Sequence, residues 1–212
     1  MNELLTLGFV ADIDHWFGQL GNNFLNATNG FFTPILKIIT SLGNFGLVFI
    51  IISFVMLFFV KTRKAGTVAI GAMFLGLLLS NILLKNVVAR PRPFTQTESD
   101  FFLWWQAAGS LPESGYSFPS GHTTAATAFS FSMFLCFNKK SSWLYLLIPF
   151  LIGFTRIYFM VHYSTDVIMA MVVGIICSVS SFFIIRQLLK LKPIEKLYNL
   201  PSVVSLFKKK AE

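Results

Sequence analysis

Five apolar stretches, each close to the length of a membrane crossing, restrict most strongly how this chain can fold. They lie near residues 43–60, 65–84, 119–137, 143–160 and 164–186. A helix needs about 20 predominantly apolar residues to cross the hydrocarbon core of a bilayer, and its backbone groups must be paired within the segment. The sequence therefore predicts an all-α integral membrane protein, with a bundle of five to six transmembrane helices.

The composition of the chain supports a membrane protein and argues against a nucleic-acid-binding protein and against a disulfide-bonded or zinc-binding one. Hydrophobic residues make up 55% of the chain and charged residues 12%, and the mean hydropathy is +0.69. The net charge of +8 does not indicate nucleic acid as a partner, because most Lys and Arg residues flank apolar stretches, as in membrane loops. Cys136 and Cys177 lie within apolar stretches without a C-x-x-C pattern, which predicts neither a disulfide nor a zinc site.

The first 42 residues are expected to differ from the bundle. Acidic residues and asparagines interrupt their apolar pattern, which favours an amphipathic segment at the membrane interface. A sixth span over residues 24–42 is the alternative, and it would bury Pro34 and Lys37 in hydrocarbon. Glu3 and the absence of a basic start argue against a cleaved signal peptide. We therefore expect an N-terminal segment over residues 1–42, a catalytic bundle over 43–190 and a basic cytoplasmic tail over 191–212.

Basic residues predict how the bundle is oriented in the membrane. The loops at 61–64 and 138–140 and the C-terminal tail carry clusters of Lys and Arg. With five alternating spans they share one side, and basic loops face the cytoplasm. The loop 85–118 and the N-terminus then lie outside the cytoplasm. We expect a multi-pass protein of the cell membrane whose active site lies at the extracytoplasmic end.

Three polar stretches share that extracytoplasmic side, and the last is the richest in ionisable groups. It contains Arg156, His162 and Asp166, and ionisable residues at membrane depth mark functional sites by default. His162 and Asp166 are four residues apart, so on a helix they would share a face. Asp166 could then accept the Nδ1 proton and leave Nε2 free as a base or nucleophile. The alternative is an ordinary helix-stabilising pair, with Arg156 reaching the lipid headgroups.

The other two stretches each have a plain structural interpretation alone. Ser120, Gly121 and His122 open a helix, and a helix N-terminus attracts anions, although a capped helix start is common. Lys85 and Arg92 could also sit among headgroups. Together the stretches supply three cations, a helix N-terminus and two histidines. This set suits phosphoryl transfer, which needs charge stabilisation, a nucleophile and a leaving-group acid.

The spacing of these residues resembles the signatures of one family. The patterns K-x6-R-P, P-S-G-H and R-x5-H-x3-D occur in this order between residues 85 and 166, and they look like the three motifs of the type-2 phosphatidic acid phosphatase family. The resemblance implies a metal-independent lipid phosphatase whose site is related to that of the vanadium haloperoxidases. One departure is Thr155, where the family usually has Ser; the hydroxyl is retained.

The resemblance also implies roles for the motif residues. His162 would attack phosphorus and form a phosphohistidine, Asp166 would orient His162, and His122 would protonate the leaving oxygen. The remaining motif residues would bind phosphate: Lys85, Arg92, Ser120, Gly121 and Arg156. No metal or other cofactor is expected, because Asp166 is the only acid in the motifs and one carboxylate does not build a magnesium site.

The expected partners are a lipid phosphate substrate and the surrounding membrane lipids; no protein partner is indicated. Family substrates include undecaprenyl diphosphate, phosphatidylglycerophosphate and phosphatidic acid, and the sequence leaves the choice open. A transporter and a non-catalytic lipid-phosphate binder are the alternative functions. A transporter would need charges distributed along several spans, and a binder would be expected to lack one histidine. A vanadate-dependent oxidase has no need of membrane spans. The aromatic segment 101–105 is a belt at the membrane surface, a lid over the site or a wall for the lipid chain.

Overall fold

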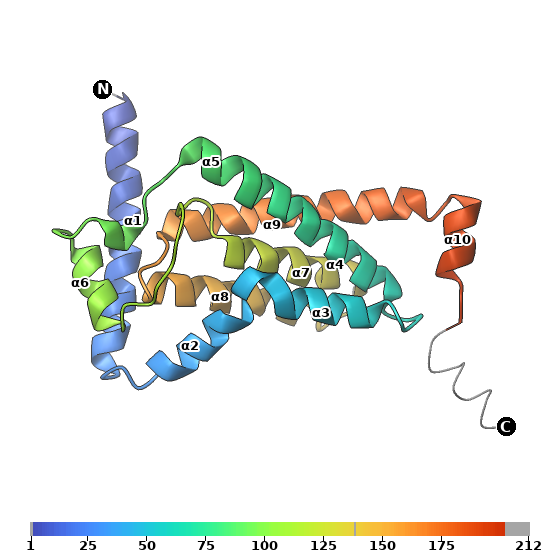
Figure 1. The fold of residues 1–212 in the computed structure, drawn as a ribbon, viewed down its shortest axis with the longest axis horizontal. Coiled ribbons are helices and arrows are strands. Elements are labelled where there is room, and N and C mark those ends of the chain that lie inside the picture. Colours follow the sequence, from blue (N-terminus) through green and yellow to red (C-terminus); the bar gives the residue numbers. More distant parts are fainter. Residues whose placement is uncertain (1, 138, 202–212) are drawn as a thin grey trace.

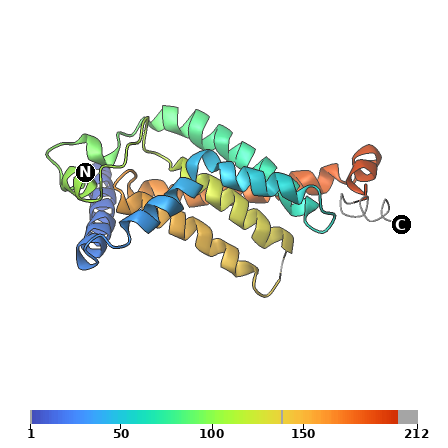
Figure 2. The same cartoon turned by 60° about the horizontal axis from the view of Figure 1, so that its bottom comes forward.

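The helices of the core lie side by side in one elongated bundle (Figures 1 and 2). This computed structural model describes residues 2–137 and 139–201, and within them all regular secondary structure is helical. The bundle contains α3 (Leu47–Met56), α4 (Arg63–Gly76), α7 (Gly121–Phe137), α8 (Leu147–Tyr158) and α9 (Ser164–Leu188). The predicted all-α class is therefore confirmed for the described part of the chain.

Helix length gives fewer membrane spans than the apolar pattern predicts. Among the described residues, Arg63–Thr95 and Ser164–Leu188 are long and apolar enough to cross a membrane. Thr33–Leu42 and Leu47–Met56, bent by 52°, give a third span if the pair is counted as one. Ser142–Tyr158 is apolar but shorter. The expected five to six spans are not confirmed, because several apolar stretches include residues that form the connections between helices.

The second apolar stretch forms one long helix with an irregular middle. α4 continues into a π-helix, η2 (Leu77–Leu84), and then into α5 (Lys85–Val88). π-helical turns are rare and often occur at functional sites. The helix ends at Ala89, which has a left-handed conformation with φ of 48°. Lys85 is thereby carried to the end of the bundle where the chain turns away.

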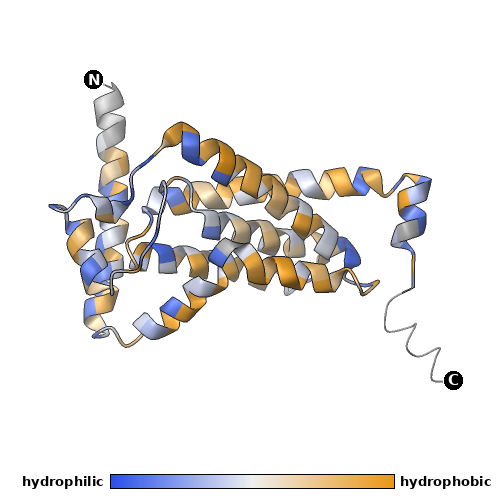
Figure 3. Cartoon of the chain, viewed as in Figure 1, coloured by the Kyte–Doolittle hydropathy of each residue, from blue (hydrophilic) through white to orange (hydrophobic). Residues whose placement is uncertain are grey.

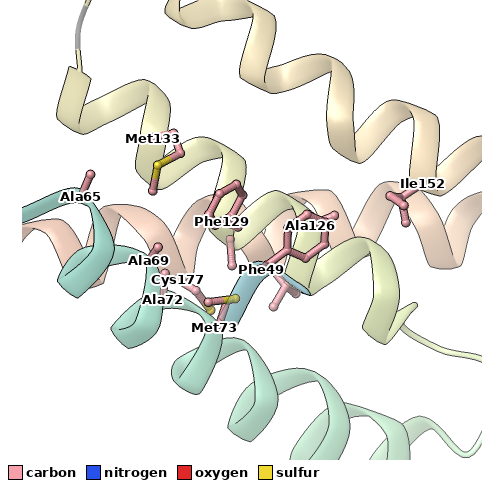
Figure 4. Close-up of a cluster of buried hydrophobic side chains, with 12 residues drawn as sticks. Phe49, Ala65, Ala69, Ala72, Met73, Ala126, Phe129, Met133, Ile152 and Cys177 are labelled. Atoms are coloured by element: carbon pink, nitrogen blue, oxygen red, sulfur yellow. The ribbon is translucent and has the colours of Figure 1, made fainter. Parts of the chain in front are cut away.

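Small side chains fill the centre of the bundle. Ala69 and Ala72 of α4, Ala126 of α7 and Cys177 of α9 are all buried in the cluster shown in Figure 4. At Gly174 of α9 an added Cβ would lie 2.5 Å from Thr127 Cβ. Small residues allow membrane helices to approach closely enough for dispersion and hydrogen bonds to hold them together.

Large apolar side chains cover the outside of the bundle. Phe74, Ile82 and Phe150 are 58%, 57% and 62% exposed, and apolar residues dominate the outer helix faces in Figure 3. In water such a surface would be unfavourable, whereas lipid chains solvate it. The distribution of small residues inside and large apolar residues outside is that of a membrane bundle.

The N-terminal region forms two helices that cover one end of the bundle. α1 (Asn2–Ala27) crosses that end, and α2 (Thr33–Leu42) leads back to α3 (Figure 1). The chain turns between them at Asn29 and Gly30, which both have positive φ. Residues 24–42 therefore do not form the single continuous span considered as an alternative. Leu25 and Leu36 pack in a second core with Tyr158.

The two ends of the bundle differ in character. The three polar stretches lie at the end that carries α1 and α6 (Asp100–Ala107), and α10 (Lys192–Tyr198) lies at the opposite end (Figure 1). The loop at 61–64 lies at the end that carries α10. Of the predicted basic tail, Lys208–Lys210 lies outside the described residues. Two-ended charge of this kind agrees with the expected orientation, which stays a prediction.

This orientation can be tested by labelling introduced cysteines. Gln96 and Ser141 are exposed and lie in loops at opposite ends. In a background with Cys136 and Cys177 replaced by alanine, a membrane-impermeant thiol reagent should label Gln96→Cys in intact cells. Ser141→Cys should react only after permeabilisation, because basic loops remain in the cytoplasm. The reverse labelling pattern would place the polar end in the cytoplasm.

Candidate active site

All three polar stretches meet at the end of the bundle covered by α1. Lys85 lies in α5, and Arg92 lies in the connection that follows it. His122 lies in the first turn of α7, Arg156 in the last turn of α8, and Asp166 in the first turn of α9. Residues up to 81 positions apart in the sequence, from Lys85 to Asp166, thus form one site.

A cavity of about 660 Å³ opens at this site. Its polar wall includes Lys85, Arg92, Glu113, His122 and His162. Gly121 also lines it, and a Cβ at this position would lie 2.9 Å from Asn81 Oδ1. The other wall is apolar and comes from α3, α4 and η2. Its side chains are those of Ile50, Ile70, Met73, Phe74 and Leu77. The cavity therefore joins a cationic end to an apolar end.

Backbone carbonyls fix the Arg92 guanidinium. Arg92 is 2% exposed, and it donates to the carbonyl oxygens of Ser114, Gly115 and Val161 at 2.7, 2.9 and 2.7 Å. A guanidinium buried without hydrogen-bond partners would cost several kcal/mol, and these three carbonyls provide the partners. The guanidinium is therefore oriented by the chain before any ligand arrives.

Arg156 is buried equally deeply and is paired with Glu113. It is 1% exposed, and it donates to Thr40 Oγ1 at 2.8 Å and to Glu113 Oε2. The other carboxylate oxygen, Glu113 Oε1, lies 3.7 Å from Arg92 Nη2. Glu113 thus sits between the two arginines and faces the cavity. Burial raises the pKa of Glu113, but Arg156 and Arg92 outweigh it and hold the pKa below its usual value.

His162 and Asp166 meet, but in a different arrangement from the one predicted. His162 lies in the connection between α8 and α9, and α9 begins only at Ser164. His162 and Asp166 therefore do not share a helical face. The chain turns at Met160, where φ is 52°, and brings His162 Nδ1 to 3.5 Å from Asp166 Oδ2. Asp166 Oδ2 also accepts from Tyr163 N at 2.9 Å. The carboxylate therefore caps α9 as well as facing the imidazole.

The surroundings of His162 define its tautomer. Arg92 Nη1 lies 3.3 Å from His162 Nε2, and because a guanidinium only donates, Nε2 must accept. The ring proton is then on Nδ1, toward Asp166. Burial, together with Arg156 and Arg92, lowers the pKa of His162 to about 4 despite the opposing effect of Asp166. At neutral pH the imidazole is uncharged, and its Nε2 carries the lone pair that faces Arg92.

The residues of the P-S-G-H pattern at the start of α7 do not all face the cavity. His122 lines the cavity, and its Nε2 lies 2.9 Å from Asn44 Oδ1. Ser120, predicted to bind phosphate, is instead fully buried, and its hydroxyl oxygen accepts from Thr123 Oγ1 at 3.0 Å and Thr123 N at 3.4 Å. Ser120 thus caps α7, because its side chain accepts from the backbone N–H of Thr123 in the first turn.

Four polar residues of the site were not identified from the sequence. Ser117 donates to Asp166 Oδ2 and lies 3.5 Å from His162 Nδ1. Glu113 pairs with Arg156, as described above. Arg90 bridges the two acids Asp14 and Asp166. Glu113 and Ser117 could have been suspected from their position just before the second motif and Arg90 from its place beside Arg92, but nothing in the sequence links Asp14 to the site.

The donor set at this site does not resemble a metal centre. Across the described residues, no three His, Cys, Asp or Glu side chains lie together in a way that could hold a metal ion. Asp166 is held by Ser117, Tyr163 and Arg90, and Glu113 by the two arginines. Cations of the chain occupy the positions next to the carboxylates.

Comparison with known proteins identifies the family. The family model of the PAP2 superfamily matches residues 65–190, which is more than half of the 212-residue chain. The chain therefore belongs to the PAP2 superfamily. The matched region contains all three motifs and leaves α1, α2 and α3 outside.

Two curated relatives match shorter stretches. The bacitracin transport permease protein BcrC of Bacillus licheniformis is 35% identical over 83 residues, which cover 39% of this chain and 40% of that protein. The undecaprenyl-diphosphatase BcrC of Bacillus subtilis (strain 168) is 47% identical over 60 residues, which cover 28% of this chain and 31% of that protein. The matches thus span less than half the length of either relative.

Two solved structures have a similar fold over most of their length. LpxE of Aquifex aeolicus has a TM-score of 0.60 at 28% identity, covering 77% of this chain and 92% of that one. The transmembrane PAP2-type phosphatidylglycerolphosphate phosphatase of Bacillus subtilis has a TM-score of 0.63 at 24% identity, covering 87% and 94%. At that identity the second likeness shows the fold alone. Together with the apolar helices, these relatives show that the chain is a membrane protein.

The position of Glu113 predicts how the site responds to a small anion. Glu113→Gln removes the carboxylate that competes for Arg156 and Arg92, so inorganic phosphate should bind more tightly. We expect the dissociation constant to fall about tenfold, equivalent to about 1.4 kcal/mol. Calorimetric titration of the purified protein in detergent would measure it. Glu98→Gln removes an acid from the exposed loop and serves as the control; unchanged or weaker binding in Glu113→Gln would contradict the prediction.

Proposed function

We propose that this protein is a phosphatase that hydrolyses the phosphate or diphosphate headgroup of a membrane lipid and releases its terminal phosphate. The observation that carries the proposal is the cavity, in which Lys85, Arg92 and His162 lie at one end and apolar side chains of α3 and α4 at the other. A lipid phosphate has the same division between an anionic headgroup and an apolar chain. The apolar wall would receive the lipid next to the headgroup, and large apolar side chains such as Phe74 continue it to the bundle surface.

His162 is the proposed nucleophile. Its Nε2 lone pair would attack phosphorus, and the bond between phosphorus and the leaving oxygen would break to give a phosphohistidine. The imidazole gains positive charge in this step, and Asp166 beside Nδ1 would stabilise it. Water would then attack phosphorus and break the P–N bond, which releases inorganic phosphate and restores the neutral imidazole.

His122 is the proposed general acid. It lines the same cavity as His162 and its Nε2 contacts Asn44 Oδ1. His122 would give a proton to the leaving oxygen in the first step and take one from the attacking water in the second. The contact with Asn44 would hold the ring in place between the two steps.

Three cations are proposed to stabilise the charge that develops on the phosphoryl oxygens. Lys85 and Arg92 line the cavity, and Arg156 lies behind Glu113. Electrostatic stabilisation of this kind is usually the largest contribution to such a reaction. Glu113 would have to leave Arg156 when the substrate enters. Gly121 would allow the phosphate to approach the N-terminus of α7.

Among lipid phosphates, we favour a polyprenyl diphosphate such as undecaprenyl diphosphate. The similarity to a protein named undecaprenyl-diphosphatase supports this choice. Three cations also match the charge of a diphosphate monoester better than that of a monophosphate. Phosphatidylglycerophosphate and phosphatidic acid remain the comparison substrates. The three polar stretches lie together at one end of the bundle, which favours an enzyme over a transporter, although one relative carries a transport name.

The proposed activity is tested by phosphate release from a panel of lipid phosphates. Purified protein in detergent should release inorganic phosphate in the presence of EDTA, fastest from undecaprenyl diphosphate. Chelation should have no effect, because Lys85, Arg92 and Arg156 supply the positive charge that a metal would otherwise bring. His162→Ala is the matched inactive control. Failure to release phosphate from every lipid, or a loss of activity that magnesium restores, would overturn the proposal.

Separate roles for the two histidines predict different behaviour in their variants. His162→Ala should form no acid-labile phosphoenzyme, since it lacks the nucleophile. His122→Ala should lose about 10²–10⁴-fold in rate on a monophosphate lipid. Its loss should be smaller on a diphosphate lipid, because the departing phosphate monoester is far less basic than an alkoxide.

Quenched-flow trapping and phosphate release, on one monophosphate and one diphosphate lipid, would measure both effects. Vanadate, which mimics five-coordinate phosphorus, should inhibit the wild-type protein. A phosphoenzyme in His162→Ala would exclude His162 as the nucleophile. Equal losses on both lipids in His122→Ala would exclude a role in leaving-group protonation.

A further inference from the structure

Asp14 of α1 is a buried carboxylate that contacts the start of α9. It is 2% exposed, and its Oδ1 accepts from Ser164 Oγ at 2.7 Å and from Thr165 N at 2.9 Å. Its Oδ2 accepts from Thr165 Oγ1 at 2.9 Å and from Arg90 Nη2 at 2.7 Å. An ionised carboxylate is buried this deeply only when donors surround it, and here four donors do so.

Arg90 connects Asp14 to the carboxylate of the active site. Its Nη1 donates to Asp166 Oδ1 at 2.7 Å and its Nη2 to Asp14 Oδ2 at 2.7 Å. The guanidinium also lies over the ring of Tyr163, with its carbon 3.8 Å from the ring centroid. The planar fork of an arginine can hold two carboxylates at fixed positions, which the ammonium of a lysine does less well.

The contacts form a row of alternating charge that ends at His162. Asp14 is negative, Arg90 positive and Asp166 negative, and Asp166 faces Nδ1 of His162. Arg90 alone would offset the charge of Asp166 and weaken its support for a positive imidazole. Asp14 takes up part of the charge of Arg90, which leaves Asp166 effective toward His162.

We propose that Asp14 and Arg90 are positioning residues of the reaction, which hold Asp166 against His162 and tune the charge that the imidazole experiences. This inference rests on the proposed role of His162 as the nucleophile. It makes the docking of α1 part of the active site, although α1 lies outside the region matched by the family model. Neither residue is among those that line the cavity, so both would act through Asp166.

Charged groups face His162 from every element packed around it. Asp166 belongs to α9, Arg156 to α8 and Arg92 to the connection after α5. His122 of α7 and Lys85 of α5 line the same cavity as His162, as does Glu113 of the loop before α7. The Asp14 and Arg90 variants described below leave all six of these groups in place, so a change in the titration of His162 in those variants reports on Arg90 or Asp14.

Opposite changes in charge should move the titration of His162 in opposite directions. Asp14→Asn removes a negative charge, so Asp166 becomes the only carboxylate paired with Arg90. The midpoint of the His162 titration should therefore fall. Arg90→Gln removes a positive charge and should raise it. A unit charge about 10 Å away, with an effective dielectric constant of about 20, predicts shifts of about 1 pH unit. Asp14 keeps its contacts with Ser164 and Thr165 in Arg90→Gln, which keeps α1 docked.

The chain contains only 3 histidines, so imidazole titrations can be followed by NMR with labelled histidine in detergent. His15→Gln and His122→Gln would assign the signals. Asp12→Asn makes the same chemical change at an exposed position of α1 and should leave the midpoint of His162 unchanged. Arg90→Lys keeps the charge but loses the fork, so its midpoint should stay near that of the wild type while its kcat falls. If Arg90→Gln does not fold, Asp14→Asn and Arg90→Lys still provide the test.

Downward and upward shifts in Asp14→Asn and Arg90→Gln, with a parallel movement of the acidic limb of kcat/KM, would support the proposal. Lower thermal stability with an unchanged midpoint would show that the ion pairs only dock α1, and would overturn it. The NMR titration requires no turnover, so it separates the two proposals. A wild-type protein that releases phosphate from no lipid would refute the proposed function even if both shifts are observed.

Discussion

The burial of Arg92 and Arg156 is the constraint on which the architecture of the site depends. Two guanidinium groups with 2% and 1% exposure would each cost several kcal/mol without compensation. Carbonyl oxygens of the 114–115 loop and of Val161 compensate Arg92, and Thr40 and Glu113 compensate Arg156. These partners come from three segments, which are the 113–115 loop, the turn that contains Val161 and α2. The folding of these segments and the orientation of the arginines therefore cannot be separated.

The same constraint explains why the site needs a counter-ion of its own. A cradle of cations that attracts phosphate strongly is unstable when empty, because like charges repel across a buried space. Glu113 supplies a carboxylate of the chain at this position, and with 24% side-chain exposure it can leave toward the cavity. In the proposed function, the substrate replaces one anion by another. The affinity for phosphate is then a difference between two ion-pairing states, which limits how tightly the product is held.

The sequence predicts the helices of the bundle and the residues that line the cavity better than it predicts the supporting contacts. Apolar stretches and motif spacing are local patterns, and they located Lys85, Arg92, His122 and His162 around one cavity. The expected helical pairing of His162 and Asp166 was wrong, because a turn at Met160 precedes α9. Ser120 was assigned to phosphate because the motif includes it, whereas its hydroxyl caps α7. The contact between Asp14 and Arg90 depends on how α1 crosses the bundle, and no local pattern contains that information.

The segment from Arg90 to Pro93 contributes one arginine to the cavity and another to the contacts that hold Asp166. Arg90 and Arg92 each precede a proline, which favours an extended backbone, and Arg92 has φ of −76° and ψ of 155°. Arg92 reaches the cavity and His162, while Arg90 holds Asp166 from the opposite side and binds α1. His162 therefore lies between two arginines of the same segment, one acting on Nε2 and the other, through Asp166, on Nδ1. A change in the backbone of this segment would alter the proposed phosphate contacts of Arg92 and the basicity of His162, the proposed nucleophile, together.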